Sequence, residues 1–319
     1  MRLLRGITAW RYHAVTAGLL SLLTMSCGTG IEMSNRVTDM DVRRVIEQTD
    51  NRQPIVTIDA FRDSLPAWKT GKRFWVADNQ VRLLFSRSSE YDIDTVSIAG
   101  HVLEYNGYDT GDLYDNRATV NLMFRDAVDG KTYVYRTGKT VDSFGPGFSV
   151  PMMIDMDMVD HIASQVVGKD YYIRTAIWYD RHTEQMMTGR HFIKVHVDSV
   201  LPGNAVMPLR LLFTTADTRE ASMVWISDNA STMHGRDFDA LFVDRNPHES
   251  YPSITDANWE LITRGQIVEG MTKEECRLSL GSPRRIGENP DQGGMREYWY
   301  YDGGAYLYFV DGLLNQFRR

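Results

Sequence analysis

Residues 296–317, REYWYYDGGAYLYFVDGLLNQF, predict three β-strands joined by two tight turns. Aromatic and aliphatic residues dominate each of the three runs, as expected of half-buried strands. The steps Asp302-Gly303 and Asp311-Gly312 are typical of hairpin turns, because glycine accepts the positive φ angle that such turns require. The stretch therefore predicts a three-stranded antiparallel sheet in the C-terminal part of the chain.

Alternation along these strands sorts the aromatic residues onto two faces. Leu307 and Phe309 are the more apolar pair of the second strand, so we expect them in the core. The opposite face is then a partly exposed tyrosine stripe, and tyrosine is favoured at protein interfaces because one end of the ring is apolar and the other accepts water. The expected protein-binding residues are Tyr298, Tyr300, Tyr306 and Tyr308.

Two capped helices are expected immediately before these strands. Residues 270–283, GMTKEECRLSLGSP, begin with a capping box between Thr272 and Glu275 and end at Gly281. Residues 255–265 predict a second capped helix. The predicted fold of this part is an α+β module, with two helices on a three-stranded antiparallel sheet.

The same part of the chain resembles the SmpA/OmlA (BamE-like) lipoprotein domain over about residues 252–319. The shared motifs are Gly-Met-Thr at 270–272, Leu-Gly-Ser-Pro at 280–283, the Trp-Tyr-Tyr strand and the Phe-Val-Asp-Gly hairpin. The resemblance implies an outer-membrane lipoprotein that supports β-barrel assembly or envelope integrity without catalysis. The chain departs from the family in carrying a long β-rich region in front of the module. A similar arrangement of elements occurs in protein inhibitors, so it argues for protein binding more than for one named machine.

From Pro54 to about Ser227 the sequence has period-two patterning with β-branched and aromatic residues, which predicts one or two small β barrels or sandwiches. A weak internal repeat aligns Gly71-Lys-Arg-Phe-Trp-Val with Gly168-Lys-Asp-Tyr-Tyr-Ile. It also aligns Asn121-Leu-Met-Phe-Arg with Arg210-Leu-Leu-Phe-Thr. Two related β domains and one larger sandwich both fit this pattern.

The N-terminal residues predict export. Three arginines without an acid precede an apolar run at 14–25, which is typical of a signal peptide and shorter than the roughly 20 residues of a membrane span. The run 23–27, Leu-Thr-Met-Ser-Cys, resembles a bacterial lipobox, which implies cleavage before Cys27 and a lipid anchor on its thiol. In some Gram-negative groups, lipoproteins displayed on the cell surface carry an acidic run just after the anchoring cysteine. Here Glu32 is the one acidic residue soon after Cys27. We therefore expect an outer-membrane protein that faces the periplasm.

Charge argues against nucleic acid as a partner. The chain has a formal net charge of −7, and loss of the three arginines in residues 1–26 gives −7 − 3 = −10. A mildly acidic protein without a basic stripe is a poor ligand for a polyanion. No nucleic acid partner is therefore expected. The expected partners are the membrane, through the lipid on Cys27, and envelope or β-barrel assembly proteins. No cofactor is expected.

Candidate metal ligands gather in a predicted helix within residues 151–168. Asp157, Asp160 and His161 have the spacing to share one helix face and hold a cation. The interpretation that we favour is helix capping, since aspartates in a first turn accept from free amides. No metal site is therefore expected.

No catalytic motif accompanies these residues, so we expect a non-enzymatic envelope protein that binds other proteins through its C-terminal module. A glycan- or peptidoglycan-associated binding protein or hydrolase, acting through the β domains, is the alternative. The predicted segments are a lipoprotein signal peptide (1–26), a tether with a short helix (27–52), two β domains (53–150 and 151–250) and the C-terminal module (251–319).

Overall fold

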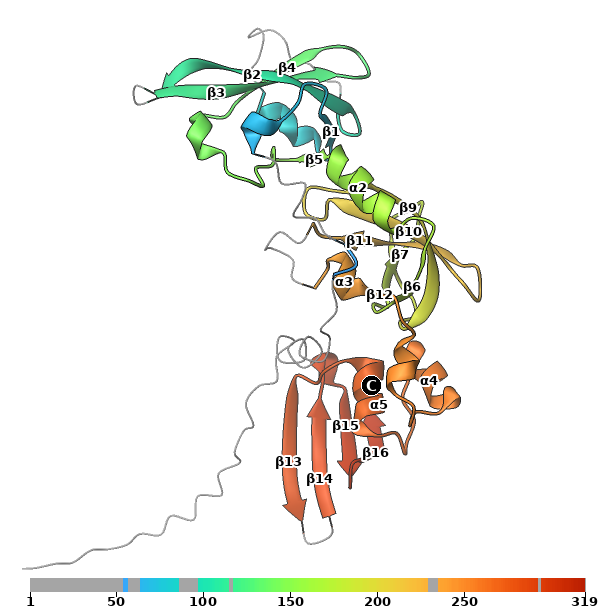
Figure 1. Cartoon of the computed structure of the whole chain (residues 1–319). Helices are drawn as coiled ribbons and strands as arrows, with labels where there is room; N and C mark the ends of the chain where they lie inside the picture. Colours follow the sequence, from blue (N-terminus) through green and yellow to red (C-terminus); the bar gives the residue numbers. More distant parts are fainter. Residues whose placement is uncertain are drawn as a thin grey trace, which may run out of the picture. The chain divides into compact units, whose positions relative to one another are not determined.

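The computed structural model describes residues 54–56, 64–85, 97–114, 117–228, 235–291 and 294–318. Within these ranges sixteen strands form three antiparallel sheets, and four short α-helices accompany them (Figure 1). Cys27 lies outside the described residues. Short 3₁₀ turns occur at Leu65–Ala67, Asn79–Leu83, Val141–Ser143, Pro247–Ser250 and Asp302–Gly304.

The first sheet has the strand order β4-β3-β2-β1-β5. Its interior is lined by fully buried side chains such as Val76, Leu103 and Phe124. The strand bounds are β1 Arg73–Val76, β2 Val102–Tyr114, β3 Arg117–Asp126, β4 Thr132–Arg136 and β5 Met153–Asp155.

The second sheet has the order β12-β6-β9-β10-β11-β7-β8. Helix α2, Met156–Val166, contacts β9 and buries Val159, Ile162 and Val166 in the core of this sheet. The other elements are β6 Asp170–Ile173, β7 Ile177–Tyr179, β8 Met186–Thr188, β9 Ile193–Pro202, β10 Leu209–Thr215, β11 Ala221–Ile226, α3 Phe238–Leu241 and β12 Phe242–Val243.

These two sheets share one strand order. The series β5-β1-β2-β3-β4 in the first corresponds to β12-β6-β9-β10-β11 in the second, and the β7–β8 hairpin is an addition to the second. Equivalent backbone hydrogen bonds accompany the shared order. The amide of Gly71 donates to the carbonyl of Tyr105 at 2.8 Å, and the amide of Gly168 donates to the carbonyl of Val197 at 2.9 Å. Gly71 and Gly168 are also the first residues of the two sequence runs that the internal repeat aligns.

The correspondence extends to the turn after the fourth strand of each series, β3 in the first and β10 in the second. Between β3 and β4, the amide of Asp126 donates to the carbonyl of Lys131 at 2.8 Å. Between β10 and β11, the amide of Thr215 donates to the carbonyl of Glu220 at 2.9 Å. The two turns have the same length and close with the same bond, so the likeness covers connections as well as strands.

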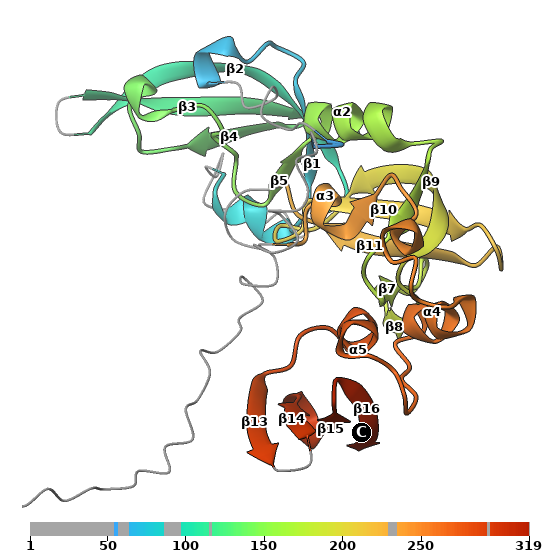
Figure 2. The same ribbon diagram turned by 60° about the horizontal axis from the view of Figure 1, so that its bottom comes forward.

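The third sheet lies in the C-terminal region and has the order β13-β14-β15-β16 (Figures 1 and 2). Two short helices precede it, and side chains from both share one core cluster with the sheet. The bounds are α4 Asp256–Thr263, α5 Lys273–Leu280, β13 Arg285–Asp291, β14 Gly294–Tyr300, β15 Tyr306–Val310 and β16 Leu313–Arg318.

The predicted fold class is wrong for both parts of the chain. Over the described residues, the β-rich region forms neither barrels nor sandwiches but two sheets of linear strand order, in which the first and last strands do not pair with each other. Period-two patterning identifies strands, whereas closure of a barrel depends on strand tilt and stagger, which the pattern does not report.

The C-terminal region is likewise built on four strands, not on two helices over a three-stranded sheet. The missed strand is β13, which pairs with β14 from Arg285 to Asp291. Its sequence, RIGENPD, contains one large apolar residue, a glycine and a proline, so it lacks the alternation by which strands are recognised.

Candidate protein-binding surface

Strand register brings the four predicted tyrosines onto one face of the third sheet. Tyr298 on β14 lies opposite Tyr308 on β15, and Tyr300 lies opposite Tyr306. Directly paired residues point to the same side of a sheet, and residues two apart in a strand do so as well. We call Tyr298, Tyr300, Tyr306 and Tyr308 the tyrosine face.

The opposite side of the same strands is core. Trp299 lies opposite Leu307, and these two side chains and that of Phe309 are fully buried. The expected core positions of Leu307 and Phe309 are thereby confirmed. Burial of these three side chains fixes the register of β14 and β15, because a slip of one residue would move all of them to the other face.

The core side of β14 also holds a charge. The carboxylate of Glu297 is buried, pairs with the ammonium of Lys273 and accepts a hydrogen bond from the indole Nε1 of Trp299. The guanidinium of Arg277 lies 4.9 Å from the centre of the Trp299 ring. The ring of Trp299 therefore contacts Arg277, and its indole N–H is bonded to Glu297. Since the side chain is also buried, it stabilises the fold and is not available to a ligand.

The tyrosine face itself is in contact with solvent. Tyr300 is 36 % exposed, and the other three tyrosines are half-buried. The rings of Tyr298 and Tyr308 stack with centroids 4.7 Å apart and an interplanar angle of 27°. Desolvation, and then the neighbouring Tyr308, raise the pKa of Tyr298 above its ordinary value. The face combines flat apolar area with hydroxyl groups that can donate or accept.

An arginine that sequence reasoning did not single out extends this surface. Arg285 lies opposite Tyr300, and its guanidinium is 4.4 Å from the centre of that ring, which is cation–π geometry. The sequence does not predict that Arg285 lies beside the tyrosines, because Arg285 belongs to β13, the strand that the sequence pattern does not reveal.

The candidate metal ligands lie at the start of α2 and are placed in ion pairs. The ammonium of Lys72 lies 2.7 Å from the carboxylate of Asp155 and 3.0 Å from that of Asp157, while Arg73 pairs with Asp160 at 2.6 Å. Burial opposes charging of Lys72, but the two carboxylates outweigh it and raise the pKa of the ammonium. The carboxylates of Asp155 and Asp157 therefore stabilise the buried ammonium of Lys72.

Helix capping uses the other carboxylate oxygen of Asp155. Asp155 is the N-cap residue of α2 and accepts a hydrogen bond from the amide of Asp157 at 2.9 Å. Asp160 and His161 follow in the first turns of the same helix. Among the described residues, no group of three histidine, cysteine or acidic side chains is close enough to hold a metal ion.

Cys276 and His191 are buried, and neither is placed for chemistry. Burial raises the pKa of the Cys276 thiol to about 12, which removes the thiolate that a nucleophile needs. The Nε2 of His191 donates to the carbonyl of Leu278 at 3.1 Å. The side chain of His196 is partly exposed and pairs with Asp170, so it lies at the surface whereas His191 lies in the interior.

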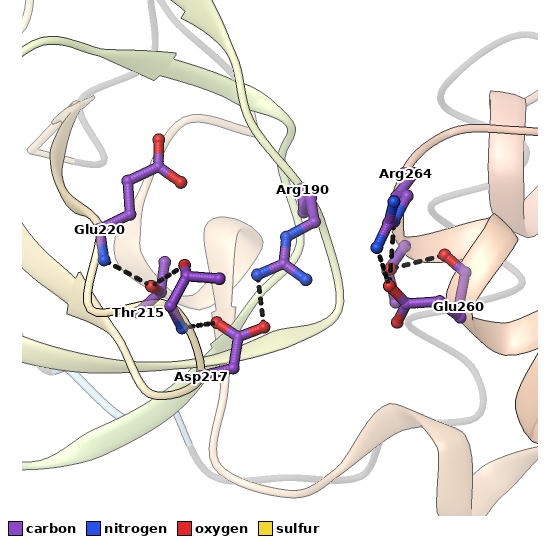
Figure 3. A network of polar contacts seen from close by, with 8 residues as sticks. Arg190, Thr215, Asp217, Glu220, Glu260 and Arg264 are labelled. Carbon is purple, nitrogen blue, oxygen red and sulfur yellow. Dashed lines mark hydrogen bonds and ion pairs between the residues drawn. The ribbon is translucent and has the colours of Figure 1, made fainter.

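Polar side chains on the second sheet form a network that closes a turn (Figure 3). The hydroxyl of Thr215 accepts from the amide of Glu220 at 2.9 Å, and Asp217 pairs with Arg190 at 2.5 Å. Burial alone would raise the pKa of the Asp217 carboxyl, but the hydrogen bonds from Arg190 and from the amide of Thr218 outweigh it and lower that pKa. These contacts hold the β10–β11 turn, and a separate pair in the same view joins Arg264 to Glu260 of α4.

Two tryptophans of the β-rich region, Trp68 and Trp178, are buried. Trp178 has no exposed surface, its indole N–H donates to the carbonyl of Thr175, and its ring packs edge-on against Phe213. Trp68 is 9 % exposed and stacks on Phe148. These rings offer no platform on which a sugar could stack.

No protein-family model matches the chain, and no match is found among curated proteins or solved structures. Within the described ranges, every helix is too short or too polar to cross a membrane.

Proposed function

We propose that the chain is a non-enzymatic, lipid-anchored protein of the cell envelope that binds a protein partner through the tyrosine face. The observation that supports this proposal is the contrast between the two sides of β14 and β15. One side is a closed core with Trp299, Leu307 and Phe309, and the other presents four tyrosines to solvent. Rigid, half-exposed aromatic rings give a large contact area at a low entropic cost, and tyrosine is enriched among residues that dominate binding energy.

The location in the cell is proposed from sequence. The lipobox-like run 23–27 supports lipidation at Cys27, and the ordered motifs between 270 and 312 support a relation to the SmpA/OmlA (BamE-like) proteins. On this proposal the protein is held at the outer membrane, faces the periplasm and contributes to β-barrel assembly or envelope integrity.

The test compares tagged full-length proteins recovered from detergent-solubilised envelopes. Tyr306→Ala with Tyr308→Ala should abolish recovery of the partner that the unchanged protein retains, since both rings leave the surface. Leu83→Ala is the matched control, because Leu83 is 81 % exposed and lies on the first-sheet region. Retention of the same partner by the double tyrosine variant, with its fold intact, would refute the proposal.

A further inference from the structure

Arginines surround the tyrosine face on three of its four strands. Arg285 of β13 lies opposite Tyr300, and Arg318 of β16 lies opposite Tyr306. Arg296 precedes Tyr298 by two residues on β14, so it points to the same side. Arg285 and Arg318 are exposed. The tyrosines are therefore bordered by positive charge along both outer strands.

Negative charge is not found on that side among the strand residues whose side chains the structure describes. The remaining positions there are occupied by Gly287, Val310, Leu313 and Gln316. The carboxylate of Glu297, on β14, points into the core and is neutralised by Lys273. This local excess of arginine contrasts with a whole chain of formal charge −7.

From this arrangement we infer that the partner is an acidic protein segment in which carboxylates alternate with apolar side chains; this rests on the proposed function. Carboxylates would pair with Arg285 and Arg318, and guanidinium–carboxylate pairs can form two parallel hydrogen bonds. The apolar side chains would cover the rings of Tyr306 and Tyr308. Arg285 is already held against the ring of Tyr300, so less side-chain freedom is lost when it pairs.

A second copy of the chain does not fit this surface face to face. Two copies would bring arginine against arginine, and like charges across an interface cost binding energy. An acidic partner instead gains from charge complementarity, which speeds association and excludes wrong partners. The charge pattern thus selects among the protein partners that a tyrosine surface alone would accept.

The experiment measures binding of two labelled peptides to the full-length protein by fluorescence anisotropy. One peptide alternates Glu with Val and the other alternates Lys with Val. The unchanged protein should prefer the acidic peptide, and the preference should weaken as salt is added. Arg285→Glu with Arg318→Glu should weaken binding of the acidic peptide by about tenfold or more and favour the basic peptide. Arg264→Glu, a change at the exposed arginine that follows α4, should leave the preference unchanged.

Equal binding of both peptides, or no change on charge reversal at Arg285 and Arg318, would overturn the inference. Arginine-dependent binding to phosphatidylglycerol vesicles without binding to the acidic peptide would also overturn it, in favour of a lipid. Either result leaves the proposed protein-binding role open to its own test, because that test removes Tyr306 and Tyr308 and keeps the arginines.

Discussion

Tyr298 and Trp299 are neighbours in the chain, yet they lie in opposite surroundings. Trp299 is fully buried and donates its indole N–H to Glu297, whereas Tyr298 is half-buried and stacks on Tyr308. Alternation along β14 therefore separates a residue that holds the fold from one that is available to a partner. This separation allows stability and binding to be tested by different substitutions.

Phe309→Ala is expected to destabilise the C-terminal region. Its ring has no exposed surface and lies 4.8 Å from the Trp299 ring, so truncation leaves a cavity that costs about 3 to 5 kcal/mol. Tyr306→Ala with Tyr308→Ala should cost much less, since both rings are already partly in solvent. Urea unfolding of the purified variants compares the free energies, and a larger loss in the tyrosine variant than in Phe309→Ala would show that the faces are wrongly assigned.

Alternation of Leu307 and Phe309 with Tyr306 and Tyr308 is sufficient to predict the buried side of β15, because hydrophobic burial selects one of only two registers. The capping box of Thr272 and Glu275 was also read correctly, and both of its hydrogen bonds are present.

Other features depend on contacts that sequence spacing does not report. Strand β13 forms although RIGENPD lacks a strand pattern, because β14 offers it a free edge with which to pair. The partner of Asp155 and Asp157 is Lys72, more than 80 residues earlier in the chain. A local reading of the acidic residues could therefore suggest capping or a metal, but it could not find the ammonium that lies between them.

Stability should fall below neutral pH in a way that depends on His191. Burial lowers the pKa of its imidazole, and the hydrogen bond to the carbonyl of Leu278 opposes this only in part. His191 therefore binds a proton more readily in the unfolded chain than in the folded one. Its contribution to the free energy of unfolding is complete above about pH 6.5 and is lost as pH falls through the lower pKa of the folded state.

The measurement is urea unfolding at about pH 7.5 and about pH 5.5. His191→Gln should show a smaller loss of unfolding free energy between the two pH values than the unchanged protein. His196→Gln is the control, since this ring is exposed beside Asp170. An identical pH dependence in His191→Gln and the unchanged protein would contradict the assignment.

The thiol of Cys276 should resist modification in the folded protein. With a pKa of about 12 and no exposed surface, it is neither ionised nor accessible at about pH 8. Labelling with a thiol-reactive chromophore in the Cys27→Ala form isolates this group, because the sequence has only these two cysteines. Labelling is expected only after urea is added, and rapid reaction of the native protein would contradict the burial.

Cys27→Ala should abolish membrane attachment. Without the thiol that would carry the lipid, the chain should accumulate as an unprocessed or soluble precursor. Fractionation followed by mass spectrometry of the N-terminus checks both points. Recovery of Cys27→Ala in the membrane fraction with normal processing would remove the support for a lipoprotein.

Site-specific photocrosslinking in intact cells tests the central claim most directly. A benzophenone amino acid at position 308 should form an adduct with one protein partner, because the Tyr308 ring lies on the tyrosine face beside Tyr298. The same group at position 83 should form none, although Leu83 is more exposed than any of the four tyrosines. Adducts from position 83 alone, or equal adducts from both positions, would contradict a protein-binding role for the tyrosine face.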